Sequence, residues 1–173
     1  MIFRPAAAAD AHSVCALVNA AYRGESSRRG WTTEADVLDG QRIDPDMFLV
    51  LIGEEGARVE LAFLPEGGLA GCVELKRESP GCCYLGMLTI DPARQRGGLG
   101  HRLLARAEQL AREWGCSQMR MRVIEGRDAL IQYYQRRGYR LTGEHEPFPQ
   151  GDPRFGIPKV RGLRFCVLAK PLL

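Results

Sequence analysis

The sequence predicts a single α/β domain, and two features of the chain lead to that prediction. Segments with strand-like and helix-like apolar spacing follow one another in the order β-α-α-β-β-β-α-β-α-β-β. A glycine-rich turn at residues 91–100 joins a strand-like run directly to a helix-like run. The chain has 173 residues, 45% hydrophobic and 26% charged, and shows no repeat, long linker or low-complexity tract. We therefore expect residues 1–173 to form one domain with its own core.

The first half of the chain is expected to supply a strand, two helices and three further strands. Asp10 is placed to cap the first helix, and Asp44 followed by Pro45 is a typical start for the second. Between these helices, residues 23–41 are polar and irregular. Glycine and proline turns separate the strands that follow. In chain order the expected elements are a strand at 2–4, helices at 11–22 and 45–53, and strands at 58–64, 69–78 and 83–90.

The second half is expected to alternate helices and strands. After the glycine-rich turn, apolar residues recur at helical spacing as far as Trp114. A second helix has Leu130 and Tyr134 on one face, and Gly138 is placed to end it. The expected elements are a helix from Leu99 to Trp114, a strand at 119–123, a helix at 128–137, and strands at 139–144 and 163–169.

The glycine-rich turn is the strongest functional signal, because a strand that leads through glycines into a helix N-terminus can hold phosphate. An ATP-binding loop needs Lys and then Ser or Thr after its last glycine, but Gly100 is followed by His101 and Arg102. A dinucleotide loop needs a third glycine and an acidic residue about 20 positions later, and both are missing. These two kinds of loop are therefore disfavoured.

Residues 95–100, Gln-Arg-Gly-Gly-Leu-Gly, match the Gln/Arg-x-x-Gly-x-Gly/Ala signature of the GNAT superfamily of N-acetyltransferases, and Pro92 precedes them. The chain resembles that superfamily over nearly its whole length. The resemblance implies an α/β (α+β) fold with a mixed, mainly antiparallel sheet flanked by helices, and acetyl-CoA as co-substrate. It places the pyrophosphate on the loop and the pantetheine arm on the preceding strand. The implied cofactor-binding residues are Leu88, Thr89, Ile90, Gln95, Arg96, Gly97, Gly98, Leu99, Gly100 and His101.

A tyrosine is implied as the group that protonates the departing thiolate. The superfamily motif Asn-x-x-Ala-x-x-x-Tyr-x-x-x-Gly-Phe/Tyr aligns with residues 127–139 and puts Tyr134 at the tyrosine position. A phenol is protonated at pH 7 and can donate to a thiolate; the alternative is that Tyr134 only packs in the core. Arg127 replaces the motif's Asn, and we expect it to reach a cofactor phosphate. Leu130 replaces the motif's Ala.

The general base stays open in the sequence. Some members of the superfamily carry a glutamate on the strand before the loop, but Tyr84 occupies that position here. Glu74, on the neighbouring strand, is the first candidate, with Glu34 and His145 behind it. Neutralising a lysine-like amine at pH 7 costs about 4–5 kcal/mol, whereas an α-amine costs about 1–1.5 kcal/mol. Without a carboxylate base, an α-amine is therefore the easier substrate.

The acceptor is expected between residues 23–42 and 145–162, where Trp31, Glu34 and Phe148 are the candidate substrate-binding residues. Aromatic side chains among charged ones suit a small polar amine, whose tail can be acidic. We therefore expect acetyl transfer from acetyl-CoA to a primary amine of a small molecule. Two alternatives stay open: a catalytically degenerate acyl-CoA sensor, and transfer to a protein or peptide amine.

Composition narrows the other partners. A net charge of +3 without a dense basic run does not suggest nucleic acid. Without a long apolar stretch or a signal-peptide core, we expect a cytoplasmic protein with no membrane partner. The six cysteines form no Cys-x-x-Cys pair, so no metal site is expected. The resemblance allows a homodimer, but the acceptor's identity, the physiological role and the oligomeric state do not follow from the sequence.

Overall fold

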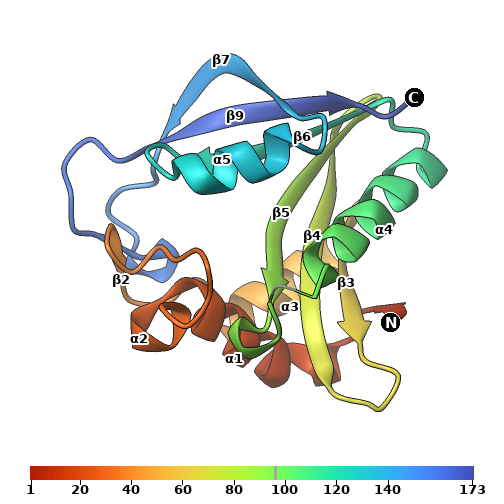
Figure 1. Ribbon diagram of the computed structural model, residues 1–173, viewed down its shortest axis with the longest axis horizontal. Coiled ribbons are helices and arrows are strands. Elements are labelled where there is room, and N and C mark those ends of the chain that lie inside the picture. The colour runs from red at the N-terminus through yellow and green to blue at the C-terminus, as the bar shows by residue number, and fades with distance from the viewer. Residues whose placement is uncertain (96) are drawn as a thin grey trace.

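A seven-stranded mixed sheet forms the centre of the protein (Figure 1). The computed structural model describes residues 1–95 and 97–173. Within this part of the chain, β5 and β6 pair in parallel and the other sheet neighbours pair antiparallel. The predicted fold class is thus confirmed. In spatial order the strands are β1 (Ile2–Pro5), β3 (Ala57–Phe63), β4 (Leu69–Ser79), β5 (Cys82–Ile90), β6 (Gln118–Ile124), β9 (Arg164–Pro171) and β7 (Arg140–Pro147).

Helices cover both faces of the sheet (Figure 1). On one face, Val14 and Val18 of α1 (Ala11–Tyr22) and Phe48 of α3 (Pro45–Gly53) pack in one buried cluster with Leu61 of β3. On the other face, α4 (Leu99–Glu113) and α5 (Asp128–Gln135) share a second cluster with β4 and β6. Because successive side chains of a strand point to opposite faces, the same sheet contributes apolar residues to both clusters.

The sheet opens between β5 and β6, which is the feature that creates space for a ligand. The two strands pair only from Cys82↔Gln118 to Leu85↔Met121, although β5 continues to Ile90. β6 instead stays with β9 as far as Ile124. Among the described residues, the last part of β5 therefore has no strand neighbour on this side. Its backbone groups are available to an extended ligand.

A bulge in β5 marks the point where the strands diverge. Glu74 of β4 lies opposite Gly86, whereas Cys72 lies opposite Thr89. Two residues of β5 consequently face one residue of β4, and Met87 adopts a φ of +50°. A positive φ is costly for a residue with a side chain, and such backbone irregularities often re-aim strands beside functional sites.

A short strand pair and a single helical turn form in segments where the sequence predicts no regular element. The two-residue strands β2 (Leu38–Asp39) and β8 (Ile157–Pro158) pair antiparallel, and a single helical turn, α2 (Gly24–Ser27), follows α1. The β2–β8 pair ties the segment after α1 to the segment before β9. These segments are the two expected on the acceptor side.

The two predicted helix caps have different outcomes. The carboxylate of Asp44 accepts a hydrogen bond from the Met47 backbone N–H at 2.8 Å, as predicted. Asp10 does not cap α1: its carboxylate instead binds the Ala7 N–H and the Arg4 side chain. The reason is a short 3₁₀ turn, Ala8–Asp10, that precedes α1. The Asp10 carboxylate accepts the hydrogen bond at the start of this turn and not at the start of α1.

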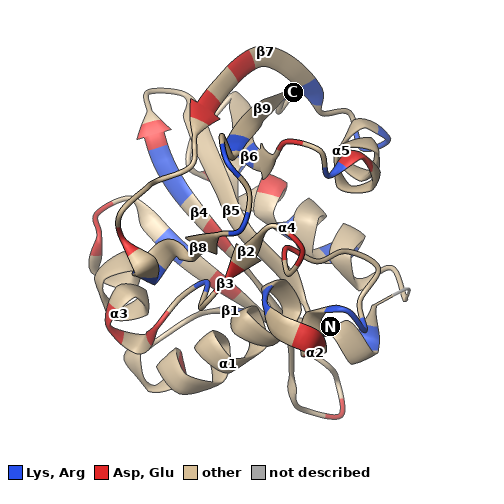
Figure 2. Ribbon diagram, turned by 90° about the vertical axis from the view of Figure 1, so that its left-hand side faces the viewer, with Lys and Arg blue, Asp and Glu red and all other residues tan. Residues whose placement is uncertain are grey.

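Charges of both signs are interspersed along the ribbon, and β4 is one of the strands that carry both acidic and basic bands (Figure 2). All six cysteines are buried and unbridged. Of the described helices, none is long and apolar enough to cross a membrane. Residues 1–95 and 97–173 also contain no group of three His, Cys, Asp or Glu side chains placed to hold a metal ion.

Candidate active site

A cavity of about 650 Å³ lies where β5 and β6 diverge. Its walls come from β4, β5, β6, the end of α1, α5, and the segments around β2 and β8. A volume of this size suits a small organic molecule. The polar and aromatic residues that line it include Tyr22, Arg23, Glu34, Arg42, Glu74, Tyr84, Arg122, Arg127, Tyr134, Phe148 and Phe155.

Glu74 projects from β4 into this cavity. Its strand partner is Gly86, and a Cβ atom on that glycine would lie 2.6 Å from Glu74 Oε2. The missing side chain therefore makes room for the carboxylate over β5. Burial raises the pKa of Glu74 above its ordinary value, although Arg42 and Lys76 act in the opposite direction. Within the described chain, no hydrogen bond occupies this carboxylate, so it can accept a proton from a ligand.

Tyr134 enters the cavity from α5. Its ring packs edge-on against Tyr133 and Tyr139, with ring centroids 5.3 and 5.8 Å away, and only 6% of the residue is exposed. Its hydroxyl makes no hydrogen bond to any described residue. Burial raises the pKa of Tyr134 far above its ordinary value, so the phenol is neutral at physiological pH and can donate a proton. Tyr133 is half-buried and packs against Trp31 and Arg137.

The glycine-rich turn ends at an open helix N-terminus. Gly98 is the N-cap of α4 with a φ of +72°, and no side chain caps the helix. The first intrahelical hydrogen bond runs from the Arg102 N–H to the Gly98 carbonyl. The N–H groups of the first turn are thus available to an anion. Arg96, which the sequence places in the same phosphate site, lies outside the described residues.

Other predicted cofactor residues have internal tasks as well. The Gln95 side chain accepts a hydrogen bond from the Trp31 N–H at 2.9 Å and donates one to the Ile90 carbonyl at 3.2 Å. On β5, the Thr89 hydroxyl donates to the Met87 carbonyl, and the Leu88 carbonyl accepts from the Tyr22 hydroxyl. These contacts fix the loop and the strand edge relative to each other.

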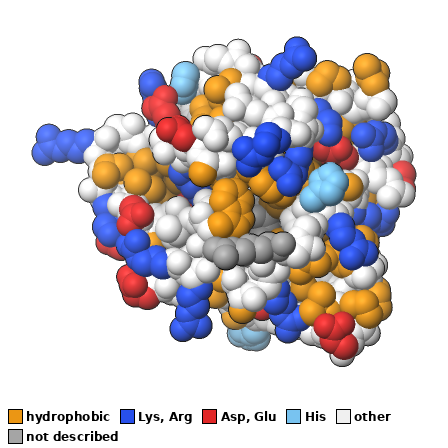
Figure 3. Space-filling model, in the orientation of Figure 1, with side chains coloured by type: hydrophobic (Ala, Val, Ile, Leu, Met, Phe, Trp, Pro, Cys, Tyr) orange, Lys and Arg blue, Asp and Glu red, His pale blue; other side chains and the backbone are white. Residues whose placement is uncertain are grey.

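The loop, the free strand edge and the gap between β5 and β6 are contiguous, and together they fit a coenzyme A. Basic side chains lie next to a hydrophobic patch near the centre of this face (Figure 3). A phosphate group needs basic side chains, and an acyl-pantetheine arm needs a hydrophobic surface. The residues present therefore suit the co-substrate that the sequence implies.

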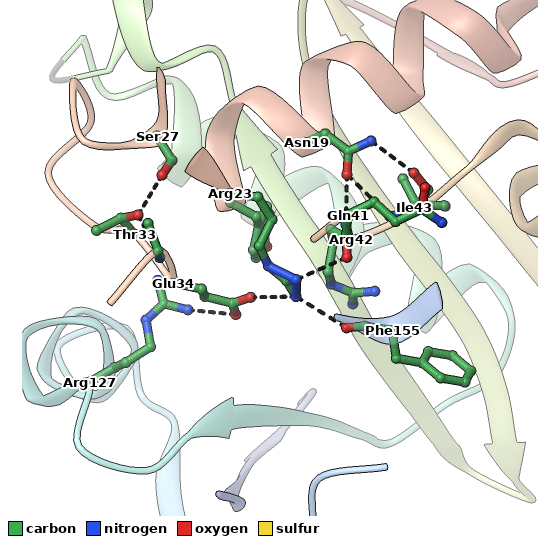
Figure 4. Close-up of polar contacts among 12 residues, drawn as sticks. Asn19, Arg23, Ser27, Thr33, Glu34, Gln41, Arg42, Ile43, Arg127 and Phe155 are labelled. Carbon is green, nitrogen blue, oxygen red and sulfur yellow. Dashed lines mark hydrogen bonds and ion pairs between the residues drawn. The ribbon is translucent and has the colours of Figure 1, made fainter. Parts of the chain in front are cut away.

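A buried network of charges, formed by Arg23, Glu34 and Arg127, lines the cavity (Figure 4). Glu34 Oε1 accepts from Arg127 Nη1 at 2.9 Å, and Glu34 Oε2 lies 3.1 Å from Arg23 Nη2. Arg23 also donates to the carbonyls of Gln41 and Phe155. The network thus holds the end of α1, the β2 segment and the β8 segment together.

Two of the predicted site residues have partners within the protein. Arg127, expected at a cofactor phosphate, instead donates to Glu34 and to the Thr32 hydroxyl, because a buried carboxylate lies within its reach. Trp31, expected to bind the acceptor, does not line the cavity; it stacks on Tyr133 with a centroid distance of 5.4 Å. The hydrogen bond from the Trp31 backbone N–H to the Gln95 side chain keeps Trp31 beside the glycine-rich turn.

The other candidates divide between cavity and surface. Phe148 is buried, packs on Phe165 with centroids 5.6 Å apart, and lines the cavity together with Glu34. His145 is exposed and lies 3.2 Å from Glu125 on the surface. Of the three base candidates, Glu74 is therefore the one whose carboxylate faces the cavity without an ion-pair partner among the described residues.

Sequence reasoning did not single out Arg42 or Tyr22. Tyr22 is the last residue of α1, Arg42 lies between β2 and α3, and both line the cavity together with Glu74. The composition of residues 23–42 carried a signal, since Arg42 lies in the segment expected to meet the acceptor. No local pattern distinguishes it from the neighbouring exposed arginines, Arg28 and Arg29.

Comparisons with known proteins agree with this geometry. The model of the acetyltransferase (GNAT) family matches residues 12–139. A blasticidin-S acetyltransferase of Streptomyces morookaense is 36% identical over 97 residues, which make up 56% of this chain and 63% of that protein. Among solved structures, nourseothricin acetyltransferase superposes with a TM-score of 0.68 at 20% identity, covering 99% of this chain and 98% of its own.

The yncA protein of Salmonella typhimurium, solved with its cofactor acetyl-CoA, gives a TM-score of 0.69 at 22% identity, covering 100% of this chain and 94% of its own. At these identities the two structures establish the fold alone. The family match extends from α1 through α5 and includes both the glycine-rich turn and Tyr134. The chain belongs to the acetyltransferase (GNAT) family.

Proposed function

We propose that this protein is an N-acetyltransferase that moves the acetyl group of acetyl-CoA to a primary amine of a small molecule. The observation that carries the proposal is that Glu74 and Tyr134, a carboxylate and a phenol with no hydrogen-bond partner among residues 1–95 and 97–173, line one cavity. That cavity lies beside the unpaired edge of β5. An acid and a base on one cavity are what direct acyl transfer to an amine requires.

Acetyl-CoA, as the donor, supplies a thioester carbonyl with a thiol leaving group. The first turn of α4 and residues 95–100 hold its phosphates, and the edge of β5 at Leu88, Thr89 and Ile90 holds the pantetheine arm. Backbone N–H groups near the β5 bulge polarise the carbonyl oxygen. The uncapped helix N-terminus and the unpaired strand edge support this assignment.

Glu74 and Tyr134 handle the two protons of the reaction. Glu74 takes a proton from the acceptor ammonium, directly or through water, so that the neutral amine can attack the carbonyl carbon. The new C–N bond forms, the C–S bond breaks, and the electron pair goes to sulfur. Tyr134 donates its proton to the departing sulfur, and the positively charged nitrogen of the new C–N bond then gives its second proton through water to the Tyr134 phenolate, which restores the phenol. The raised pKa of Glu74 brings this carboxyl closer to neutral pH, which suits a base.

A small-molecule acceptor is favoured by the shape of the site. The Arg23–Glu34–Arg127 network and the β2–β8 pair hold together segments that line the cavity, whose volume suits a small molecule. Two of the matched proteins carry names of antibiotic acetyltransferases, blasticidin-S and nourseothricin. We also expect a reducing, cytoplasmic setting, because the six cysteines are buried free thiols.

The test is an assay of thiol release from acetyl-CoA over a broad panel of amines, with the acetylated products identified by mass spectrometry. The panel includes amino acids, aminoglycosides, nucleoside antibiotics with free amines, and peptides with free N-termini. Thiol release that matches acetylation of small amines supports the proposal. Acetyl-CoA binding without release on any amine indicates a sensor, and preferential turnover of peptides indicates a protein N-acetyltransferase.

A further inference from the structure

Arg42 differs from the other basic residues on the cavity wall. Arg23 and Arg127 bind Glu34, Arg122 binds Glu78 and Glu146, and Lys76 binds Glu54. Arg77 donates to the Trp114 carbonyl. The Arg42 guanidinium, by contrast, has no hydrogen bond or ion pair to a described residue, and no dashed line reaches it in Figure 4.

The backbone holds Arg42 in place independently of its side chain. Asn19 of α1 accepts hydrogen bonds from the backbone N–H groups of Arg42 and Ile43, at 2.7 and 3.2 Å, and donates to the Ile43 carbonyl at 2.8 Å. The guanidinium lies 5.8 Å from the centroid of the Tyr22 ring. Arg42 is half-buried, and because its backbone is already anchored, less of it has to be ordered when a ligand arrives.

Around Arg42, the positively charged groups of the cavity outnumber the negatively charged ones. Three guanidinium groups, those of Arg23, Arg42 and Arg127, face the carboxylates of Glu34 and Glu74. Burial acts to lower the pKa of Arg42, but Glu34, Tyr22 and Glu74 raise it overall, so the group stays charged. An unpaired buried charge is unfavourable, and an anion from a ligand relieves it.

We propose that the acceptor amine carries an oxyanion, a carboxylate or a phosphonate, which Arg42 binds while the amine lies against Glu74. This inference rests on the proposed function. An arginine fork can bind two oxygens of such a group at once. The two unpartnered charges of the cavity wall then meet opposite charges of one short, zwitterionic molecule. Amino acids and aminophosphonates, or larger molecules that carry such a unit, have this chemistry.

The experiment measures kcat/KM for matched pairs of amines that differ only in the anion. Amino acids are compared with their carboxamides, and 2-aminoethylphosphonate is compared with ethanolamine. The proteins are the wild type, Arg42→Gln, Arg42→Lys and the control Arg29→Gln, which removes the same charge from an exposed residue of the same segment. Thermal unfolding checks that each variant is folded.

We expect the wild type and Arg29→Gln to prefer the anionic member of a pair, and Arg42→Gln to lose about 10- to 100-fold of that preference. Arg42→Lys should restore part of it, because the charge remains without the fork. The pair that shows the effect identifies the anion as carboxylate or phosphonate. Equal turnover of both members by the wild type, or an unchanged preference in Arg42→Gln, overturns the inference and leaves the proposed function standing.

Failure of the proposed function gives a different result. In that case the folded wild type binds acetyl-CoA and releases no thiol with any amine. The role of Arg42 is then decided by ligand-induced thermal stabilisation with the same pairs. Stabilisation by the anionic member that Arg42→Gln loses supports the anion site, and equal stabilisation of both proteins overturns it.

Discussion

Glu74 and Arg42 line the same cavity, and Arg42 is the foremost positive charge acting on the Glu74 carboxyl. One comes from the middle of β4 and the other from the segment between α1 and α3. Neither side chain has a hydrogen-bond partner among the described residues. The pair therefore defines the polar end of the cavity that an acceptor would occupy.

Replacing Glu74 by Gln is expected to lower kcat by about 100-fold or more, because the acceptor ammonium loses its proton acceptor. In the wild type, kcat/KM should rise with pH as Glu74 loses its proton. The midpoint of this rise should lie above pH 4.5, because burial raises the pKa of Glu74 from its ordinary value of 4.5. This rise should be missing in the variant. The measurement is a pH–rate profile with saturating acetyl-CoA, and the exposed Glu55→Gln serves as the control.

The same variant should be more stable than the wild type at neutral pH. The folded-state pKa of Glu74 is raised, so the folded protein binds this proton more tightly than the unfolded chain. Above the folded-state pKa the buried charge opposes folding, and below the unfolded-state pKa the effect vanishes. Glu74→Gln should thus raise the Tm at pH 7–8 and leave it unchanged near pH 3. A lower Tm at pH 7–8 contradicts the burial of an unpaired carboxylate.

Tyr134→Phe is expected to lower kcat by about 100-fold while the KM for acetyl-CoA changes little. The substitution removes only a hydroxyl that has no partner in the described part of the protein, so the ring packing with Tyr133 and Tyr139 remains. Tyr133→Phe is the matched control, since it removes a hydroxyl from the adjacent packing residue. If both variants keep wild-type kcat, Tyr134 is a core aromatic residue and not the acid.

Gly98→Ala should destabilise the protein by about 1–2 kcal/mol, because a left-handed conformation is unfavourable for a residue with a Cβ. Gly98 has a φ of +72°, whereas the nearest atom to a Cβ on Gly97 would be 3.9 Å away and its φ is not in the left-handed region. Gly97→Ala should therefore stay within about 0.5 kcal/mol of the wild type. Urea unfolding measures both changes. Equal losses in the two variants would show that the N-cap conformation of α4 is not the cause.

Glu34→Gln should cost about 3–5 kcal/mol of stability, because it leaves the charges of Arg23 and Arg127 buried without a counter-charge. The double variant Glu34→Gln/Arg127→Gln should recover part of that loss, giving a clear coupling energy in a double-mutant cycle. Arg28→Gln, which breaks the exposed ion pairs with Glu25 and Asp36, should leave stability nearly unchanged. Additive effects of Glu34 and Arg127 would rule out the buried network as a unit.

The fold was largely predictable because its main elements carry local signals. The apolar spacing of α4, the Asp44 cap of α3 and the turns around β4 each belong to a short stretch of sequence. The β2–β8 pair was not predictable, since two residues per strand give no periodicity and the partners are far apart in sequence. The insertion of β9 between β6 and β7 likewise depends on long-range pairing.

The candidate site divides in the same way. The phosphate loop lies within ten consecutive residues, and Tyr134 follows from a local motif. The partners of Arg127 and the isolation of Arg42 depend on side chains from several elements. Glu34 is 93 positions away from Arg127 in the chain, and only the folded arrangement shows that this carboxylate lies within hydrogen-bonding distance of Arg127. A free guanidinium is a property of its surroundings, which the residue type does not reveal.

The most direct test of the central claim compares the wild type with the double variant Glu74→Gln/Tyr134→Phe in one assay with acetyl-CoA and the best amine of the panel. Both proteins should bind acetyl-CoA, as measured by calorimetry. The wild type should form acetylated amine in equal amount to released thiol, and the double variant should form it at least about 1,000-fold more slowly. Equal rates in the two proteins, or no acetylated amine from a wild type that binds acetyl-CoA, would contradict the claim.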